Sequence, residues 1–358
     1  EQSSCELSAP IALRCVGVLR WDATGWPRAS AVYQWIARAA VLLAGCIFSA
    51  TAFRPSGWSD ADVSRTCSGD TATACWPAAG FLSQLPLLIG AALVLVFYGP
   101  RRQQRRLEST LALMRSVYLD HATGGWRAGQ YNDRVNAVAF FLLWCCIIVA
   151  VACGDLLQGL GGVSIACHTW SVAILSAIVL CVGYDVVLAC RSLILMVDSF
   201  GCEIVGSLDL HHVTHAWNLR QAVLQKAAVD IEVCLVVLCI ILALLMPLLV
   251  IDLTLSGGLG QGAVPLIPGL FLIGSILRTI LVASMVSQTC ERVPALINAI
   301  PFGPREQEER RFAVEYVKNS ASGFHVFGDT KLTAGAVIQV TYIWCVVVVG
   351  VLTFGMAL

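Results

Sequence analysis

The side chains that could perform chemistry in this chain are few and stand apart from one another. Its three lysines, Lys226, Lys318 and Lys331, lie outside the long apolar runs or at their edges. No lysine is therefore placed to form the Schiff base that a retinal protein carries in its last span. The six histidines also lie outside those runs, which argues against a seven-span hydrolase with three intramembrane zinc ligands.

One histidine pair has the spacing of metal ligands. The segment HHVTHAW (211–217) places His211 and His215 four residues apart, on one face of a helix. Two ligands do not complete a zinc site, and without further ligands of the right spacing a solvated helix is the better interpretation of the pair. We therefore expect no metal, no cofactor and no enzymatic activity.

Asp185 and Arg278 are charged residues inside apolar runs, where an unpaired charge is costly. At ~1.5 Å per helical residue, both lie roughly 22 Å below the same membrane edge. The sequence therefore allows an intramembrane ion pair, either as a pocket floor or gating latch or as a purely structural contact. An arginine that extends toward the interface is the alternative for Arg278.

Composition predicts the elements that must hold these residues. Hydrophobic residues make up 58% of the 358 residues and charged residues only 13%, whereas soluble domains carry about a quarter charged residues. Seven apolar runs approach the ~20 residues that a helix needs to cross a bilayer. No alternating strand pattern is present, so we predict an all-α membrane protein. The predicted spans are residues 33–53, 79–98, 135–157, 170–197, 231–255, 264–290 and 333–357.

Positive charge is distributed very unevenly between the two sides of these spans. Eighteen lysines and arginines lie in segments 1–32, 99–134, 198–230 and 291–332, and only Arg54 and Arg65 lie opposite. The positive-inside rule then puts the N-terminus in the cytoplasm and the C-terminus outside, which is opposite to a G-protein-coupled receptor. Residues 1–32 contain no apolar run typical of a signal peptide. The zero net charge argues against a nucleic-acid partner.

The two sides also differ in their predicted loops. The exterior loops 158–169 and 256–263 are short, so a ligand site must lie within the bundle and be small and mostly apolar. The cytoplasmic segments 107–118 and 215–233 have helical periodicity, which predicts helices extending beyond the membrane. No inverted repeat typical of a transporter and no nucleotide-binding glycine motif is found.

Most of the sixteen cysteines lie in apolar runs, where cysteine behaves as a small hydrophobic residue. Cys67 and Cys75 lie in the longest exterior loop, 54–78, where oxidising conditions favour a disulfide. Cys167, in the next exterior loop, is the competing partner.

The C-terminal segment carries the most specific pattern. An amphipathic helix and a short turn, EERRFAVEYVKNSASGFHVFGDTKLTAGAV, lead into the last span, where Thr341 and Tyr342 precede five apolar residues. This segment resembles the seven-transmembrane insect chemoreceptor superfamily, which includes gustatory and odorant receptors and gustatory-receptor-like proteins. The Gln and Phe that follow in the family are Val348 and Val349 here.

The resemblance implies a ligand-gated, non-selective cation channel in the plasma membrane, assembled as a homotetramer around a pore lined by the last helix. It also implies a division of the chain. Residues 1–32 would form a cytoplasmic segment, 33–290 a six-helix bundle with a ligand pocket in its outer half, 291–332 an anchor helix and turn, and 333–358 the pore helix. The small, mostly apolar ligand and the cations would be the partners.

Helical geometry then selects a pore-facing set. From Thr341, one face presents the residues Thr341, Cys345, Val348 and Leu352, with Val349 beside them. We expect the level of Val348 and Leu352 to be the narrowest and to gate by dewetting, and Trp344 to pack against the bundle. The alternative function is a non-conducting seven-helix scaffold or a protein that binds lipids or small molecules.

Overall fold

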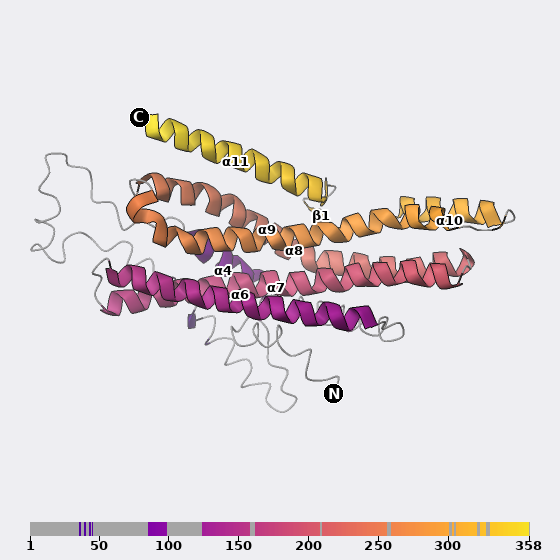
Figure 1. Ribbon diagram of the computed structural model, residues 1–358, viewed down its shortest axis with the longest axis horizontal. Coiled ribbons are helices and arrows are strands. Elements are labelled where there is room, and N and C mark those ends of the chain that lie inside the picture. The colour runs from indigo at the N-terminus through magenta and orange to yellow at the C-terminus, as the bar shows by residue number, and fades with distance from the viewer. Residues whose placement is uncertain are drawn as a thin grey trace, which may run out of the picture.

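The computed structural model describes residues 85–98, 124–157, 162–207, 210–255, 259–300, 303, 306–320, 323–326 and 330–357, and five single positions between 36 and 45. Long helices run side by side through most of this part of the chain (Figure 1). The helices are α4 (Leu85–Tyr98), α6 (Gly124–Leu157), α7 (Gly162–Ser207), α8 (Leu210–Leu255), α9 (Leu259–Ala299), α10 (Gln307–Asn319) and α11 (Ala334–Ala357). Two short strands, β1 (His325–Val326) and β2 (Thr330–Lys331), pair between α10 and α11.

The predicted all-α membrane architecture is confirmed. Helices occupy six of the seven predicted spans, and the described positions of the first span are also helical. Helices α6 to α9 each contain a stretch long and apolar enough to cross a membrane, and α11 contains a shorter one, Ala334–Val347. The longer stretches are Val135–Gly154, Thr169–Val205, Ile231–Ile251 and Leu266–Ala299. The chain is therefore a multi-pass helical membrane protein.

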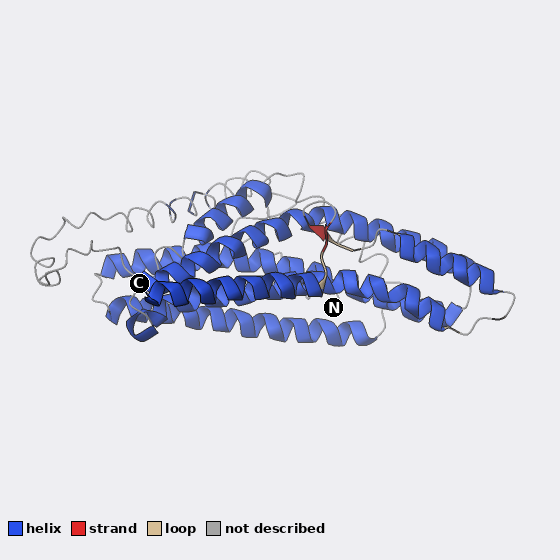
Figure 2. Cartoon of the chain, turned by 90° about the horizontal axis from the view of Figure 1, so that it is seen from above, coloured by secondary structure: helices blue, strands red, loops and turns tan. Residues whose placement is uncertain are grey.

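Several helices continue past their predicted ends. α7 and α8 together cover 198–230 except for two residues, and α9 reaches Ala299, so long helices extend beyond the predicted spans 170–197, 231–255 and 264–290 (Figure 2). At the opposite end, α7 begins at Gly162 and α9 at Leu259, so the predicted exterior loops 158–169 and 256–263 are too long. Hydropathy identifies only the part of a helix that lipid surrounds. The helix itself continues beyond that part wherever its side chains still pack against neighbouring helices.

Helices α7 and α9 run parallel and form the most extensive helix pair of the described residues. A Cβ atom added at Gly201 would lie 2.7 Å from Cδ2 of Leu296, and one at Gly183 would lie 3.1 Å from Oγ1 of Thr279. Small residues at such points let membrane helices approach closely. The two contacts also fix a nearly constant register, in which each α9 residue faces the α7 residue about 95 positions earlier.

One hydrophobic core runs along this helix pair and α8 for their whole length. It includes Leu175 near one end of α7 and Phe200 and Ile204 near the other, all at most 1% exposed. Phe324, which lies next to β1, belongs to the same core. The apolar bundle and the segment that leads into α11 are therefore packed as a continuous unit.

Candidate functional site

Among the side chains of α11 that the structure describes, the buried one lies near the beginning of the helix. Val337 is buried against the core, and Thr333 caps the helix by accepting the backbone N–H of Ala336 at 3.2 Å. Beyond this point the apolar side chains are largely uncovered, with Tyr342 69% and Ile343 60% exposed. Figure 1 shows α11 running back toward the end of the bundle opposite α10.

The predicted pore residues lie on this helix but differ in exposure. Thr341 is half-buried, and its Oγ1 donates a 2.8 Å hydrogen bond to the carbonyl oxygen of Val337. Cys345 is a free, exposed thiol, and Val349 is 59% exposed. Val348 and Leu352 lie within α11, but their side chains are outside the described residues. Trp344 is half-buried. The pore-facing set stays a prediction.

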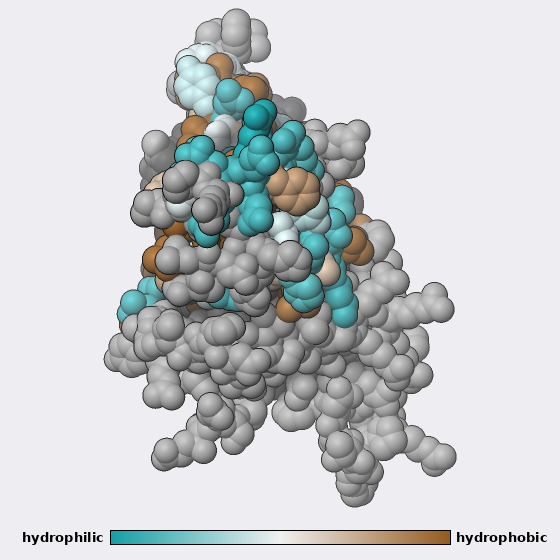
Figure 3. Space-filling view, turned by 90° about the vertical axis from the view of Figure 1, so that its right-hand side faces the viewer, coloured by the Kyte–Doolittle hydropathy of each residue, from teal (hydrophilic) through white to brown (hydrophobic). Residues whose placement is uncertain are grey.

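Helix α10 confirms the predicted amphipathic helix before the last span. Its buried residues, Ala313 and Val317, face α8 and α9, while charged residues occupy its outer side. Hydrophilic side chains gather at this end of the molecule (Figure 3). The β1–β2 pair that follows was not expected from the sequence, which indicated only a short turn.

Two hydrogen bonds tie α10 to α8. Trp217 of α8 is fully buried, and its Nε1 donates to Oγ of Ser320, at the end of α10, over 2.9 Å. The hydroxyl of Tyr316 donates to Oδ1 of Asn218. The Trp217 ring also packs at 5.3 Å, centroid to centroid, from Phe200 of α7. Three helices therefore meet at Trp217.

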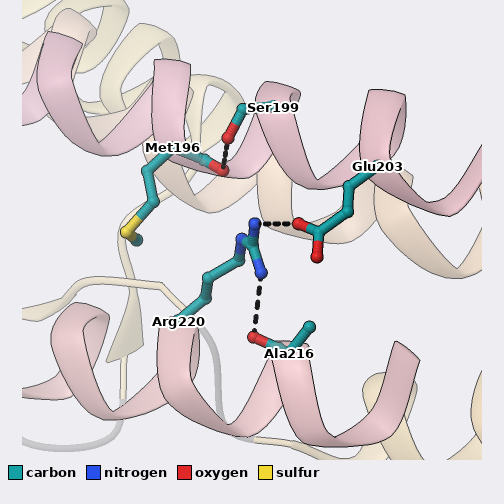
Figure 4. Close-up of polar contacts among 5 residues, drawn as sticks. All are labelled: Met196, Ser199, Glu203, Ala216 and Arg220. Atoms are coloured by element: carbon teal, nitrogen blue, oxygen red, sulfur yellow. Dashed lines mark hydrogen bonds and ion pairs between the residues drawn. The ribbon is translucent and has the colours of Figure 1, made fainter. Parts of the chain in front are cut away.

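A buried ion pair joins α7 and α8 beside this junction. The Arg220 guanidinium pairs with the Glu203 carboxylate, and the two side chains are only 4% and 18% exposed (Figure 4). Arg220 also donates to the carbonyl oxygen of Ala216 over 3.1 Å and lies 4.8 Å from the centre of the Phe200 ring. Removing one partner of such a pair leaves a buried charge, which costs about 3–5 kcal/mol.

The segment between α10 and α11 is held by α9. The backbone N–H of Phe324 donates to Oγ of Ser287 over 3.0 Å, and Leu332 donates back to the Phe324 carbonyl over 2.8 Å. Lys331 forms a 2.9 Å ion pair with Glu291. These bonds attach the segment to α9 before β1 and at β2, while β1 and α11 also pack against α8. We call α10, the strand pair and their partners on α7, α8 and α9 the anchor.

Asp185 and Arg278 lie near each other in depth. In the α7–α9 register set by Gly183 and Thr279, the backbone of Arg278 lies level with α7 about two to three residues from Asp185. Asp185 is 7% exposed, whereas the Arg278 guanidinium is partly exposed and lies 5.7 Å from the centre of the Phe140 ring. The ion pair stays a prediction. If it forms, Asp185→Asn combined with Arg278→Gln should be more stable than either single variant.

The remaining predicted sites are not brought together. Cys67 and Cys75 lie outside the described residues, and Cys167 lies in α7 with an undescribed side chain. His215 is exposed on α8. Within the described part of the chain, no group of three His, Cys, Asp or Glu residues is arranged to hold a metal ion.

Sequence reasoning missed the Arg220–Glu203 pair and the Trp217–Ser320 bond. A signal for Arg220 was present, because Ala216, Val223 and Leu224 lie three or four residues away and place it on the apolar face of its helix. Glu203 gave no comparable signal, because it lay in a segment expected to be a loop.

The arrangement defines a class of protein: a bundle of membrane helices whose extended ends form an anchor that holds a last, weakly packed helix. No protein-family model and no curated protein matches this chain. Among solved structures, it is similar to the insect olfactory receptor OR5 from Machilis hrabei, with 9% sequence identity and a TM-score of 0.61. The match covers 96% of each chain. The chain thus shares the fold of an insect olfactory receptor, as its C-terminal segment predicted.

Proposed function

We propose that this protein is a chemoreceptor of the insect superfamily and acts as a ligand-gated, non-selective cation channel in the plasma membrane. Four copies would assemble around a pore lined by α11. The observation that carries this proposal is the exposed face of α11 in a fold shared with an olfactory receptor. The protein would therefore be a receptor and not an enzyme.

The composition of α11 supports a water-filled neighbour on part of its surface. Tyr342 and Cys345, about 60° apart around the helix, are both exposed within its first half. A tyrosine hydroxyl that faces hydrocarbon is left unsatisfied, whereas one that faces a hydrated pore entrance is not. Farther along, Val349, beside the predicted pore face, is 59% exposed and apolar, as a constriction that closes by dewetting requires.

The anchor supplies a route from ligand to pore. The ligand would occupy the outer half of the bundle and would be small and mostly apolar, because the helices there are apolar. A shift of α9 would be transmitted to α11 through two contacts, Ser287 with Phe324 and Glu291 with Lys331. Tags at the two termini test the assumed orientation: a C-terminal tag should be labelled on intact cells, and an N-terminal tag only after permeabilisation.

Ionic current tests the channel directly. Val348→Gln should hydrate the constriction and raise resting current, because it adds a polar group at the predicted narrowest level. Ile343→Gln is the matched control, since it makes a similar change on the opposite side of the same helix. A thiol-reactive cation should block current through Cys345 only in the open state. A Val348→Gln protein that reaches the surface as a tetramer and carries no current would rule out the channel.

A non-conducting scaffold or a lipid- or small-molecule-binding protein is the second candidate. The specific observation in its favour is the replacement of the family's Gln and Phe by Val348 and Val349. This candidate predicts the same fold and surface expression, but no ligand-dependent current in either the wild type or the Val348→Gln variant.

A further inference from the structure

A groove opens between α8 and α10, next to the junction at Trp217. Its cavity has a volume of about 370 Å³, which is at the small end of the range of ligand sites. Because the groove lies at the α10 end of the molecule, it is separate from the pocket proposed for the outer half of the bundle. One lining residue comes from α8 and five come from α10: Gln221, Phe312, Glu315, Tyr316, Asn319 and Ser320.

The hydroxyl and carboxylate groups of this lining accept hydrogen bonds but have no hydrogen left to donate. The Tyr316 hydroxyl donates its hydrogen to the side chain of Asn218 on α8. The Ser320 hydroxyl donates to a backbone carbonyl oxygen of α10 over 2.6 Å. The ionised Glu315 carboxylate can only accept, and the two amide side chains of the lining each add a carbonyl oxygen. A ligand that pairs with these oxygen atoms must therefore donate hydrogen bonds.

Glu315 also gives the groove a negative charge. Among the described residues, Glu315 takes part in no ion pair. Arg311 and Lys318 stand four residues before it and three residues after it on α10, but both are exposed and neither lines the groove. The charge of the carboxylate therefore favours a cationic ligand over an anionic one.

Two aromatic rings supply the apolar part of the groove. Phe312 and Tyr316 are one helical turn apart on α10, and their rings are stacked with centroids 6.1 Å apart. Phe312 is 64% exposed, which is unusual for a phenylalanine. The face of an aromatic ring attracts an ammonium group and also covers apolar surface. The ligand should therefore combine a positive charge with an apolar body.

We propose that the α8–α10 groove binds a small primary amine, in which a charged ammonium group is joined to a short apolar body. An ammonium group has three donors and no acceptor, so it matches the Glu315 carboxylate and the Tyr316 oxygen. The apolar body would lie on the Phe312 ring. The ligand would contact both α8 and α10 and so stabilise the anchor. This site goes beyond the proposed channel activity, because it requires neither conduction nor a ligand in the outer half.

Calorimetric titration of the full-length protein in detergent with 2-phenylethylamine tests the site. The matched ligand control is 2-phenylethanol, which has a similar size and no charge and should bind about tenfold more weakly. Glu315→Gln should weaken binding of the amine about tenfold, as expected for the loss of a hydrogen bond between charged groups. Glu309→Gln is the matched control variant and should bind like the wild type, because Glu309 is exposed on α10 but does not line the groove.

A second substitution and a melting measurement separate binding from folding. Phe312→Leu should weaken binding of the amine about threefold, because it removes the aromatic face and keeps an apolar side chain. Glu315 and Phe312 are both exposed, so neither variant should melt below the wild type when no amine is present. The amine should raise the melting temperature of the wild type and of Glu309→Gln, but not that of Glu315→Gln.

Three outcomes would overturn the proposal. The first is a wild type that binds the amine no better than the alcohol. The second is a Glu315→Gln variant that binds the amine as well as Glu309→Gln does, because the amine would then occupy another part of the chain. The third is binding that occurs only at dilutions where the protein is monomeric, because another copy of the chain would then cover the groove. None of these measurements depends on ionic current, so they are independent of the test of the channel.

Discussion

The anchor and the second half of α11 differ in how their side chains are surrounded. In the anchor, Trp217, Phe200 and Phe324 are at most 2% exposed, and the helices that carry them are joined by the Trp217–Ser320 hydrogen bond and the Arg220–Glu203 ion pair. In α11 beyond Val337, large apolar side chains are mostly half or more exposed. The fold of one chain therefore fixes where α11 begins, and leaves what surrounds its second half to lipid or to further copies.

This contrast has a physical reason. Polar groups buried in a core are mostly paired, so the anchor geometry is restricted to arrangements that pair nearly all of them, with Nε of Arg220 as an exception. Apolar side chains facing lipid lose little by changing neighbours, because lipid tails are as apolar as leucine. The part of α11 beyond Val337 can therefore move against its surroundings at a low cost in free energy, whereas the anchor cannot.

The largest expected effect comes from the anchor ion pair. Arg220→Gln should lower the free energy of unfolding by about 3–5 kcal/mol, because it removes the buried guanidinium whose charge offsets the Glu203 carboxylate. Lys331→Gln is the matched control, since it removes an ion pair whose side chains are 32% and 51% exposed and should cost less than about 1 kcal/mol. Thermal melting in detergent measures both.

The double variant Arg220→Met with Glu203→Gln should recover part of the loss, because no uncompensated charge remains. Equal destabilisation by Arg220→Gln and Lys331→Gln would show that the anchor pair is no stronger than a surface pair, and would remove one basis for the contrast.

The next effect concerns the turn before β1. Gly323 has a φ of 122°, and a Cβ atom added there would lie 2.8 Å from Oγ of Ser287. Gly323→Ala should therefore cost about 1–3 kcal/mol and disturb the bond that holds Phe324 to α9. Gly335→Ala, within α11, meets no atom closer than 4.0 Å and should be neutral or slightly stabilising. Similar melting temperatures for the two variants would contradict this account.

A smaller effect is expected at the contact between α8 and α10. Ser320→Ala removes the acceptor of the buried Trp217 indole, which should cost about 1–3 kcal/mol, with the lower end expected at this partly buried site. Ser199→Ala is the control, because the Ser199 hydroxyl donates within α7, to the carbonyl oxygen of Met196. If both serines proved equally dispensable, the indole would have to find another acceptor without loss.

The sequence predicts the helices better than it predicts the contacts that join them in the anchor. Spans and the amphipathic α10 follow from hydropathy and helical period, because lipid and the core select apolar residues at fixed spacing. The pairing of Arg220 with Glu203 depends on how the extended parts of α7 and α8 turn back on each other, which no local pattern encodes. The same holds for the bond of Ser287 to Phe324, whose members are 37 residues apart.

The smallest effect on the single chain is expected in the second half of α11. Val337→Ala should cost about 2 kcal/mol because Val337 is buried against the core, whereas Val346 is 53% exposed and Val346→Ala should stay within about 0.5 kcal/mol. Melting should be measured in detergent at a dilution where the protein is monomeric by light scattering. In membranes, Val346→Ala should instead lower the yield of crosslinked tetramer, because only neighbouring copies would cover that side chain. If Val346→Ala destabilises the monomer as much as Val337→Ala, α11 is held along its length by its own chain, and the contrast between anchor and α11 fails.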